Sequence, residues 1–189
     1  MRLVKEMLEE EAWRKQQSYM HFAFFINVVR TAIQNGDKAW TLAFIEKYKS
    51  ELTPDKVEPT LNFCYAFIAF HDKDYEQVVY LLYSSGQFTS RAYFITKVLL
   101  LTSYYELKRY EPTLALIDTF RHTLKTDEDI TEGEREGYRL FLRFSEKITR
   151  HKLDINTVPK NRLERLRAEI IETKGIYGKL WLLEKLTEF

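Results

Sequence analysis

Side chains that could support catalysis or bind a metal are scattered through this sequence of 189 residues. None of the four histidines has a second His or Cys at the spacing that places two ligands on one helical face. The single cysteine, Cys64, lies in an apolar run with no neighbouring base to lower the pKa of its thiol. We therefore predict a buried, unreactive Cys64 and no metal site. The histidines are His21, His71, His122 and His151.

The acidic segment 127–138 has the composition of a calcium-binding loop, but its spacing does not fit one. Gly133 falls at the seventh position, where such a loop needs glycine at the sixth, and Tyr138 stands where a bidentate Glu is required. The chain also lacks a phosphate-binding glycine loop and a nucleophile triad pattern. These features predict a protein that is not an enzyme and uses no cofactor.

A basic stripe is the main electrostatic feature of the sequence. Its four members are spaced 4, 4 and 3 apart, which places them on one face of a helix. Residues 139–167 hold nine Lys and Arg against three Asp and Glu, whereas the whole chain has a net charge of +1. Such a stripe could contact nucleic-acid phosphates, although the solvated face of an amphipathic helix has the same pattern and base-stacking aromatics do not interleave with it. The stripe consists of Arg139, Arg143, Lys147 and Arg150.

The elements that carry these side chains are expected to be helices. Hydrophobic residues make up 45% of the chain and aromatic residues 15%, which is typical of a folded protein. Only six Gly and four Pro leave few positions for the tight turns of a sheet, so we predict an all-α fold. A single Cys, no signal peptide and no run of about 20 apolar residues favour a cytoplasmic protein.

One sequence pattern occurs twice in the middle of the chain. Residues 71–82 align with residues 106–117, and Tyr75 matches Tyr110 at a separation of 35. A fainter copy over 35–45 has Ala39 in place of the tyrosine, at a separation of 36. A repeat of this length predicts stacked helix pairs.

Apolar periodicity and capping residues predict where these helices begin and end. Thr131 and Glu134 form a capping-box pattern at one helix start, Pro159 opens another helix and Gly175 interrupts it. The expected helices cover about 3–33 with a break near Ser18, 38–51, 59–70, 75–83, 90–107, 111–124, 132–151, 159–174 and 176–186.

The repeated segments Lys73-Asp74-Tyr75 and Lys108-Arg109-Tyr110, each between an aromatic-rich helix and an apolar one, resemble the tetratricopeptide repeat family over residues 22–124. The runs 104–107, 141–144 and 181–186 are also similar to the C-terminal part of long, divergent tetratricopeptide-like proteins of the Bacteroidetes. The resemblance implies one domain, 1–189, forming a right-handed solenoid of antiparallel helix hairpins. An N-terminal helix (1–17) would precede about three hairpins (18–125), and helices in 131–189 would form a C-terminal cap.

Small residues at two helix contacts are typical of that family, and here the pattern departs from it. The first helices of the pairs have Arg30, Ala66 and Leu101 at the expected position, of which only Ala66 is small. The second helices have Leu42, Val78 and Thr113.

The resemblance implies a non-catalytic protein interaction scaffold whose first helices line a concave surface that holds a peptide or partner segment. The chain lacks the Lys, Asn and Arg set with which some members bind a terminal carboxylate, so that mode is not predicted. Nucleic-acid binding or regulation through the basic stripe is the alternative. The candidate partner-binding residues are Asn27, Thr31, Phe63, Phe67, His71, Thr102 and Tyr105.

The N-terminal segment has apolar positions, including Leu3, Met7 and Trp13, with no capping residue before them. Repeats at the end of a solenoid need a polar outer face or a cover. We therefore expect either that further repeats precede Met1 in a longer protein or that the chain self-associates through this helix.

Overall fold

The computed structural model describes residues 8, 19–84, 90–154 and 159–189, and every regular element in those ranges is helical. This confirms the all-α prediction for the described chain. The contacts divide the chain into two compact units, 1–88 and 89–189, and the single domain stays a prediction. The predicted N-terminal helix over 1–17 and its self-association lie outside the described residues, apart from Leu8, which is helical and buried.

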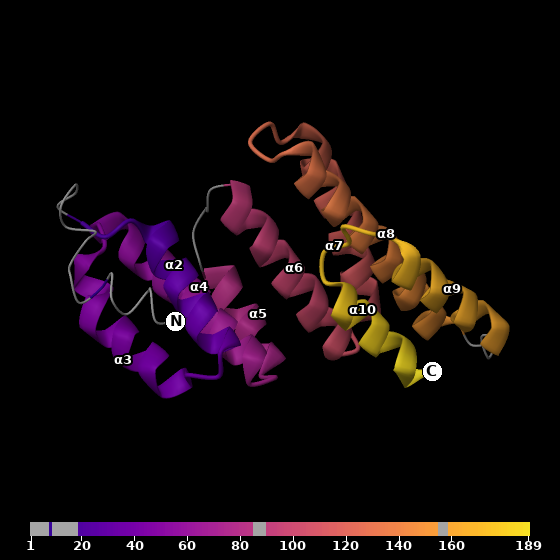
Figure 1. The fold of residues 1–189 in the computed structure, drawn as a ribbon, viewed down its shortest axis with the longest axis horizontal. Helices are drawn as coiled ribbons and strands as arrows, with labels where there is room; N and C mark the ends of the chain where they lie inside the picture. Colours follow the sequence, from indigo (N-terminus) through magenta and orange to yellow (C-terminus); the bar gives the residue numbers. More distant parts are fainter. Residues whose placement is uncertain (1–7, 9–18, 85–89, 155–158) are drawn as a thin grey trace. The chain divides into compact units, whose positions relative to one another are not determined.

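The first unit contains four α-helices among its described residues (Figure 1). Helix α2 packs against α3 and α4, and α4 packs against α5. Helix α2 begins at Phe22 after the non-helical Tyr19 and Met20, close to the expected break. Side chains such as Phe25, Phe44 and Phe63 are fully buried between these helices. The bounds are α2 (Phe22–Gln34), α3 (Lys38–Tyr48), η2 (Lys49–Glu51), α4 (Pro54–His71) and α5 (Tyr75–Ser84).

Helix α4 begins earlier than the sequence predicts. Pro54 and not Pro59 occupies the first turn, and Pro59 lies inside the helix. Proline at this position removes one backbone hydrogen bond, to the carbonyl of Asp55, which belongs to the first turn. Asp55 is exposed, so water can satisfy that carbonyl and the helix continues through Pro59.

Three turns between consecutive helices share one backbone geometry. Gly36, Lys73 and Lys108 each have a positive φ, of 77°, 62° and 58° respectively. In each turn the amide of this residue donates to the carbonyl three residues earlier, at 2.9 to 3.1 Å. The amide of the following residue donates to the carbonyl five residues before it, at 2.8 to 3.1 Å. This is the Schellman arrangement that ends helices with a left-handed residue. The repeat seen in the sequence is therefore a repeated turn.

These turns correct the alignment of the first copy. The left-handed residues Gly36 and Lys73 are 37 positions apart, and the spacing of 36 in the sequence alignment is therefore wrong by one. Lys38 is the first residue of α3 and Tyr75 is the first residue of α5, so these two residues are equivalent. The predicted equivalence of Ala39 and Tyr75 is therefore wrong. The interval from Gly36 to Lys73 is thus two residues longer than the 35 from Lys73 to Lys108, and the weak similarity of the first copy hid part of this difference.

The corrected register also changes which residues stand at the helix contacts. Val29 and not Arg30 aligns with Ala66 and Leu101, and Thr41 and not Leu42 aligns with Val78 and Thr113. All six aligned residues are fully buried. The Thr41 hydroxyl donates to the Asp37 carbonyl at 2.7 Å, so its polar atom is satisfied inside the packing. Ala66 keeps the small residue typical of tetratricopeptide repeats, whereas the other five contact positions have Val, Leu or Thr.

The second unit contains five α-helices among its described residues. Helix α7 packs against α6 and α8, and α10 packs against α8 and α9. The predicted capping box is present, because the Glu134 amide donates to Thr131 Oγ1 and the Thr131 amide donates to Glu134 Oε2. The bounds are α6 (Ser90–Glu106), α7 (Tyr110–Thr126), α8 (Glu132–Leu153), α9 (Lys160–Glu172), α10 (Lys179–Lys185) and η3 (Leu186–Glu188).

The connection between α9 and α10 contains two left-handed glycines. Gly175 interrupts the helical run as predicted, with a φ of 73°, and Gly178 follows with a φ of 65°. The last helix therefore begins at Lys179 and not at Ile176. The backbone of this connection lies against α8, where the Tyr177 amide donates to the Gly137 carbonyl at 3.2 Å.

Candidate functional site

The predicted partner-binding residues divide into accessible and buried ones. Phe63, Thr102 and Tyr105 are only 0%, 3% and 2% exposed, which places them inside the packing and not on an open surface. Thr102 satisfies its hydroxyl on the Val98 carbonyl of its own helix. Helices α4 and α6 are apolar on several faces, so their sequences carry no signal that separates a core face from a binding face.

The accessible members of the predicted set lie on two helices of the first unit that pack together, α2 and α4. Asn27 and His71 are exposed and Thr31 is half-buried. Phe67, also half-buried, stacks near Phe63 with ring centroids 6.5 Å apart. Asn27 and Thr31 belong to α2, and Phe67 and His71 belong to α4.

Arg30 joins these residues, although the sequence analysis treated it only as a departure from the repeat pattern. Its guanidinium carbon lies 5.4 Å from the centroid of the Phe67 ring, within the range of a cation–π interaction. Its Nε is buried and has no hydrogen-bond partner in the described chain. We call these five residues the α2–α4 face: Asn27, Arg30, Thr31, Phe67 and His71.

Two cations of the predicted basic stripe share one carboxylate of a neighbouring helix. Arg143 Nη2 lies 2.6 Å from Glu169 Oε1, and Lys147 Nζ lies 2.9 Å from Glu169 Oε2. Both cations also lie over the Phe144 ring, 4.5 and 5.6 Å from its centroid. These side chains therefore tie α8 to α9. Glu169 stands two positions beyond the segment in which the sequence shows a basic excess.

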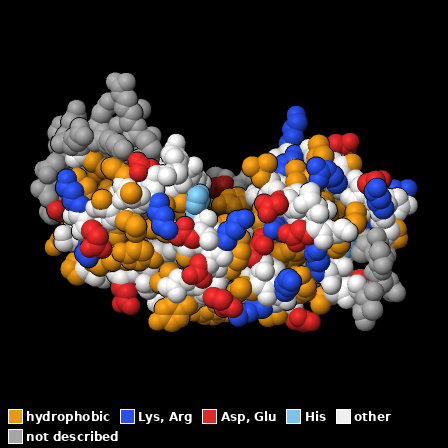
Figure 2. All heavy atoms as spheres, turned by 90° about the horizontal axis from the view of Figure 1, so that it is seen from below, with side chains coloured by type: hydrophobic (Ala, Val, Ile, Leu, Met, Phe, Trp, Pro, Cys, Tyr) orange, Lys and Arg blue, Asp and Glu red, His pale blue; other side chains and the backbone are white. Residues whose placement is uncertain are grey.

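The other two members of the stripe pair with carboxylates of their own helix. Arg139 Nε lies 2.6 Å from Glu136 Oε2, and its hydrogen bond lowers the pKa of that carboxyl. Arg150 Nη2 lies 2.7 Å from Glu146 Oε1, and Arg121 of α7 binds the other oxygen of that carboxylate, Oε2. Partial burial alone would raise the pKa of Glu146, but its hydrogen bonds to Arg121 and Arg150 lower it. On the face drawn in Figure 2, acidic and basic side chains likewise lie next to one another.

Helix α9 differs from α8 in its charges. Four of its cations are exposed, and no carboxylate of the described chain forms an ion pair with them. The four are Lys160, Arg162, Arg165 and Arg167.

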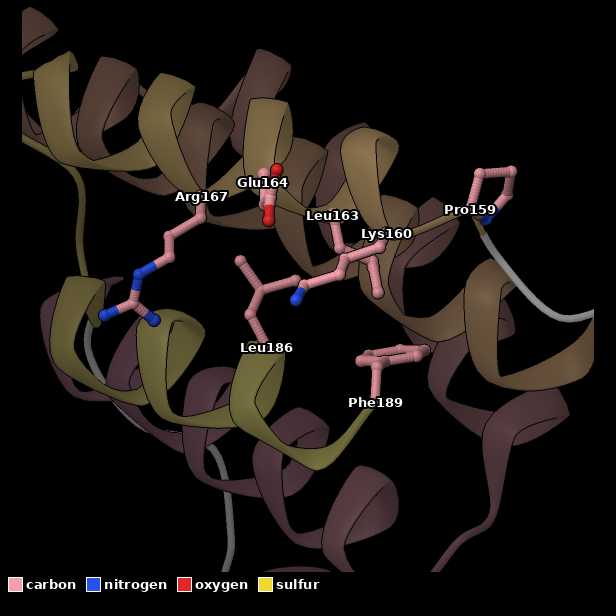
Figure 3. Close-up of a pocket in the computed structure, with 7 residues that line it drawn as sticks. All are labelled: Pro159, Lys160, Leu163, Glu164, Arg167, Leu186 and Phe189. Atoms are coloured by element: carbon pink, nitrogen blue, oxygen red, sulfur yellow. The ribbon is translucent and has the colours of Figure 1, made fainter.

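A groove of about 440 Å³ lies between α9 and η3 (Figure 3). Leu163 and Leu186 face each other across it, and the Phe189 ring closes one end. The side chains of Lys160 and Arg167 reach over it from α9. We call it the α9–η3 groove, and its lining residues are Pro159, Lys160, Leu163, Glu164, Arg167, Leu186 and Phe189.

A buried ion-pair cluster holds α10 against α6. Lys185 is 4% exposed, and its Nζ lies 2.7 Å from Glu106 and Glu188 and 3.1 Å from Glu184. Trp181 Nε1 donates to the same Glu106 oxygen at 2.7 Å. Burial alone would lower the pKa of Lys185, but its hydrogen bonds to the carboxylates raise it. The ammonium group of Lys185 is thus engaged by three carboxylates of the protein itself, which indicates a structural cluster.

The remaining reactive groups do not form a site within the described chain. Cys64 is fully buried, as predicted, and burial raises the pKa of its thiol. The described residues contain no group of three or more His, Cys, Asp or Glu side chains arranged to hold a metal ion. Burial lowers the pKa of His151, which packs edge-on against Phe189 with ring centroids 6.3 Å apart.

No protein-family model matches the chain, and the searches of curated proteins and of solved structures found no match to it. Among the described helices, none is both long enough and apolar enough to cross a membrane.

Proposed function

We propose that this chain is a non-catalytic protein interaction scaffold that binds a peptide or partner segment on the α2–α4 face. The observation that carries this proposal is the juxtaposition of Arg30 and Phe67 on two packed helices that also carry the exposed Asn27 and His71. The guanidinium and the amide can hydrogen-bond a partner's main chain or side chains, and the Phe67 ring offers apolar contact.

We also propose that the helices form a right-handed solenoid of antiparallel hairpins of the tetratricopeptide type, with α8 to α10 as its cap. Three turns with the same hydrogen bonds support this proposal, as does the packing of α2 against α4, the first helices of two successive pairs. In such an arrangement the first helices share a surface, and a partner segment can contact several repeats at once.

A peptide selection tests the α2–α4 face. We expect peptides selected from a random library against the folded chain to perturb backbone amides of α2 and α4 in NMR titrations. Replacing the exposed Asn27 by Arg should weaken their binding by about tenfold or more, because a long cation would occupy the surface between the two helices. Fluorescence anisotropy with labelled peptides measures this change.

The matched control is Gln77→Arg, the same kind of substitution at an exposed position of α5. It should leave peptide affinity within about twofold of the wild type, as expected for a surface site away from the contact. Equal binding of the selected peptides to wild type and Asn27→Arg would show that the α2–α4 face is not the site.

Nucleic-acid binding through the stripe of α8 is the second candidate, and the ion pairs of Arg139, Arg143, Lys147 and Arg150 argue against it. A phosphate would have to displace Glu136, Glu146 or Glu169 from these cations, which offsets the gain of the new contact. We expect an electrophoretic mobility assay with duplex DNA and single-stranded RNA at about 50 mM salt to give no shift that depends on Arg143. A shift that is lost in Arg143→Glu and retained in the exposed Lys125→Glu would favour nucleic-acid binding.

A further inference from the structure

We propose that the α9–η3 groove is a second docking site, which takes the apolar face of an acidic amphipathic helix from a partner protein. The groove lies within the second unit and the α2–α4 face within the first, so either site can be tested without the other. The proposal depends on the apolar groove lining and on the unpaired cations beside it.

The floor and one end of the groove are apolar and held in place. Leu186 is 8% exposed and forms part of the core, whereas Phe189 is 43% exposed. Two residues at the end of α8 support the Phe189 ring: Lys152 Nζ lies 4.0 Å from its centroid, and His151 packs against it edge-on. The aromatic ring is therefore presented to solvent in a supported position, as an anchor for an apolar side chain.

The cations beside the groove determine the charge of its partner. Lys160 and Arg167 are seven residues apart on α9, so their backbone positions are separated by about 10.5 Å along the helix. Leu163 and Glu164 lie between them on the same helical face. Glu164 disfavours a carboxylate next to it, whereas Lys160 and Arg167, one turn before and one turn after it on α9, favour carboxylates.

The contrast with α8 makes this charge available to a partner. Glu169 is used by Arg143 and Lys147, whereas none of the described carboxylates forms an ion pair with Lys160 or Arg167. A cation already engaged in an internal ion pair gains less from a new carboxylate than an unpaired one does. The positive charge of α9 therefore complements an acidic segment.

A helix laid along α9 matches this arrangement. Its two acidic residues would be seven positions apart, facing Lys160 and Arg167. If the first acidic residue is at position i and the second at i+7, large apolar residues at i+3 and i+4 would enter the groove above Leu186 and against Phe189. This is the helix-in-groove mode of peptide recognition, in which residues at i, i+3, i+4 and i+7 provide the contacts.

Three synthetic helical peptides test the inference on the full chain. They share one apolar face and differ only in the two flanking residues seven positions apart, which are Glu, Gln or Lys. In fluorescence anisotropy we expect the Glu peptide to bind about tenfold more tightly than the Gln peptide, and the Lys peptide to bind most weakly. This preference should decrease as salt is raised.

Charge reversal on α9 provides the matched comparison. The double variant Lys160→Glu, Arg167→Glu should lose about tenfold or more in affinity for the Glu peptide and should prefer the Lys peptide instead. The double variant Arg162→Glu, Arg165→Glu changes the net charge of the same helix equally at exposed positions that do not line the groove. It should retain binding within about threefold. Circular dichroism confirms that both variants keep their helical content.

The apolar part of the site is tested by Phe189→Ala, which should weaken the Glu peptide about fivefold or more because the anchor ring is removed. NMR spectra of the wild-type chain, independent of any variant, should show perturbation of Leu163 and Leu186 methyl groups on titration with this peptide. The proposal fails if the Glu peptide does not saturate the protein, if all three peptides bind equally, or if the two double variants behave alike.

Discussion

Lys185→Met should lower the free energy of unfolding by roughly 3–5 kcal/mol, the largest effect we expect from a single substitution at a charged residue. Methionine keeps most of the aliphatic stem but removes the ammonium group that contacts Glu106 and Glu188 at 2.7 Å. The partly buried Glu106 carboxylate would then lose this positively charged partner and keep the hydrogen bond from the neutral Trp181 indole. Urea denaturation followed by far-ultraviolet circular dichroism measures the change.

A charge-neutral double variant separates the ion pair from the packing of the side chain. In Glu106→Gln, Lys185→Met the amide oxygen can still accept the Trp181 hydrogen bond, and no unpaired charge remains at that position. We expect the double variant to regain a large part of the stability lost by Lys185→Met alone, because neutral replacements of both partners avoid an uncompensated charge. The exposed Lys174→Met is the surface control, and its effect should stay within about 0.5 kcal/mol. A loss in Lys185→Met no larger than in this control would exclude a stabilising cluster.

The second large effect is expected at Gly137, where α8 meets the connection between α9 and α10. A Cβ added to Gly137 would lie 2.8 Å from the Gly175 carbonyl oxygen, which is backbone and cannot rotate away. The displacement would also strain the hydrogen bond from the Tyr177 amide and separate the Tyr138 and Tyr177 rings, whose centroids are 4.9 Å apart. We expect Gly137→Ala to cost about 2–3 kcal/mol, because this clash exceeds the gain in helix propensity.

Gly133→Ala is the matched control in the same helix. A Cβ at Gly133 meets no atom within 4 Å, so only the backbone preference changes. Alanine there should leave stability unchanged or raise it by up to about 1 kcal/mol. In thermal unfolding, Gly137→Ala should therefore lower the midpoint temperature, whereas Gly133→Ala should leave it unchanged or raise it. Equal midpoints would mean that the α9–α10 connection does not pack closely on α8.

The sequence alone determined the helices and most of their ends, because the signals for these are local. Apolar periodicity and caps act within a few residues, so the helical class, the box of Thr131 and Glu134, and the break at Gly175 were predicted as they occur. The same reasoning misplaced the start of α4, because it took Pro59 as the first turn of the helix. The helix begins at Pro54, and Pro59 is close enough to that start to be tolerated inside it. It also misaligned the first repeat by one residue, because only the left-handed Gly36 fixes that register.

The tertiary structure alone decided which functional candidates are accessible and which charges are paired. The packing of α4 and α6 buries Phe63, Thr102 and Tyr105, and the sequence could not select among the apolar faces of those helices. Glu169 meets Arg143 from 26 positions away, so the basic excess counted along the chain is not the charge presented to solvent on α8. The groove between α9 and η3 likewise joins residues that periodicity assigns to separate helices. Burial and ion pairing between helices depend on how distant segments pack, and the local patterns that specify each helix do not contain that information.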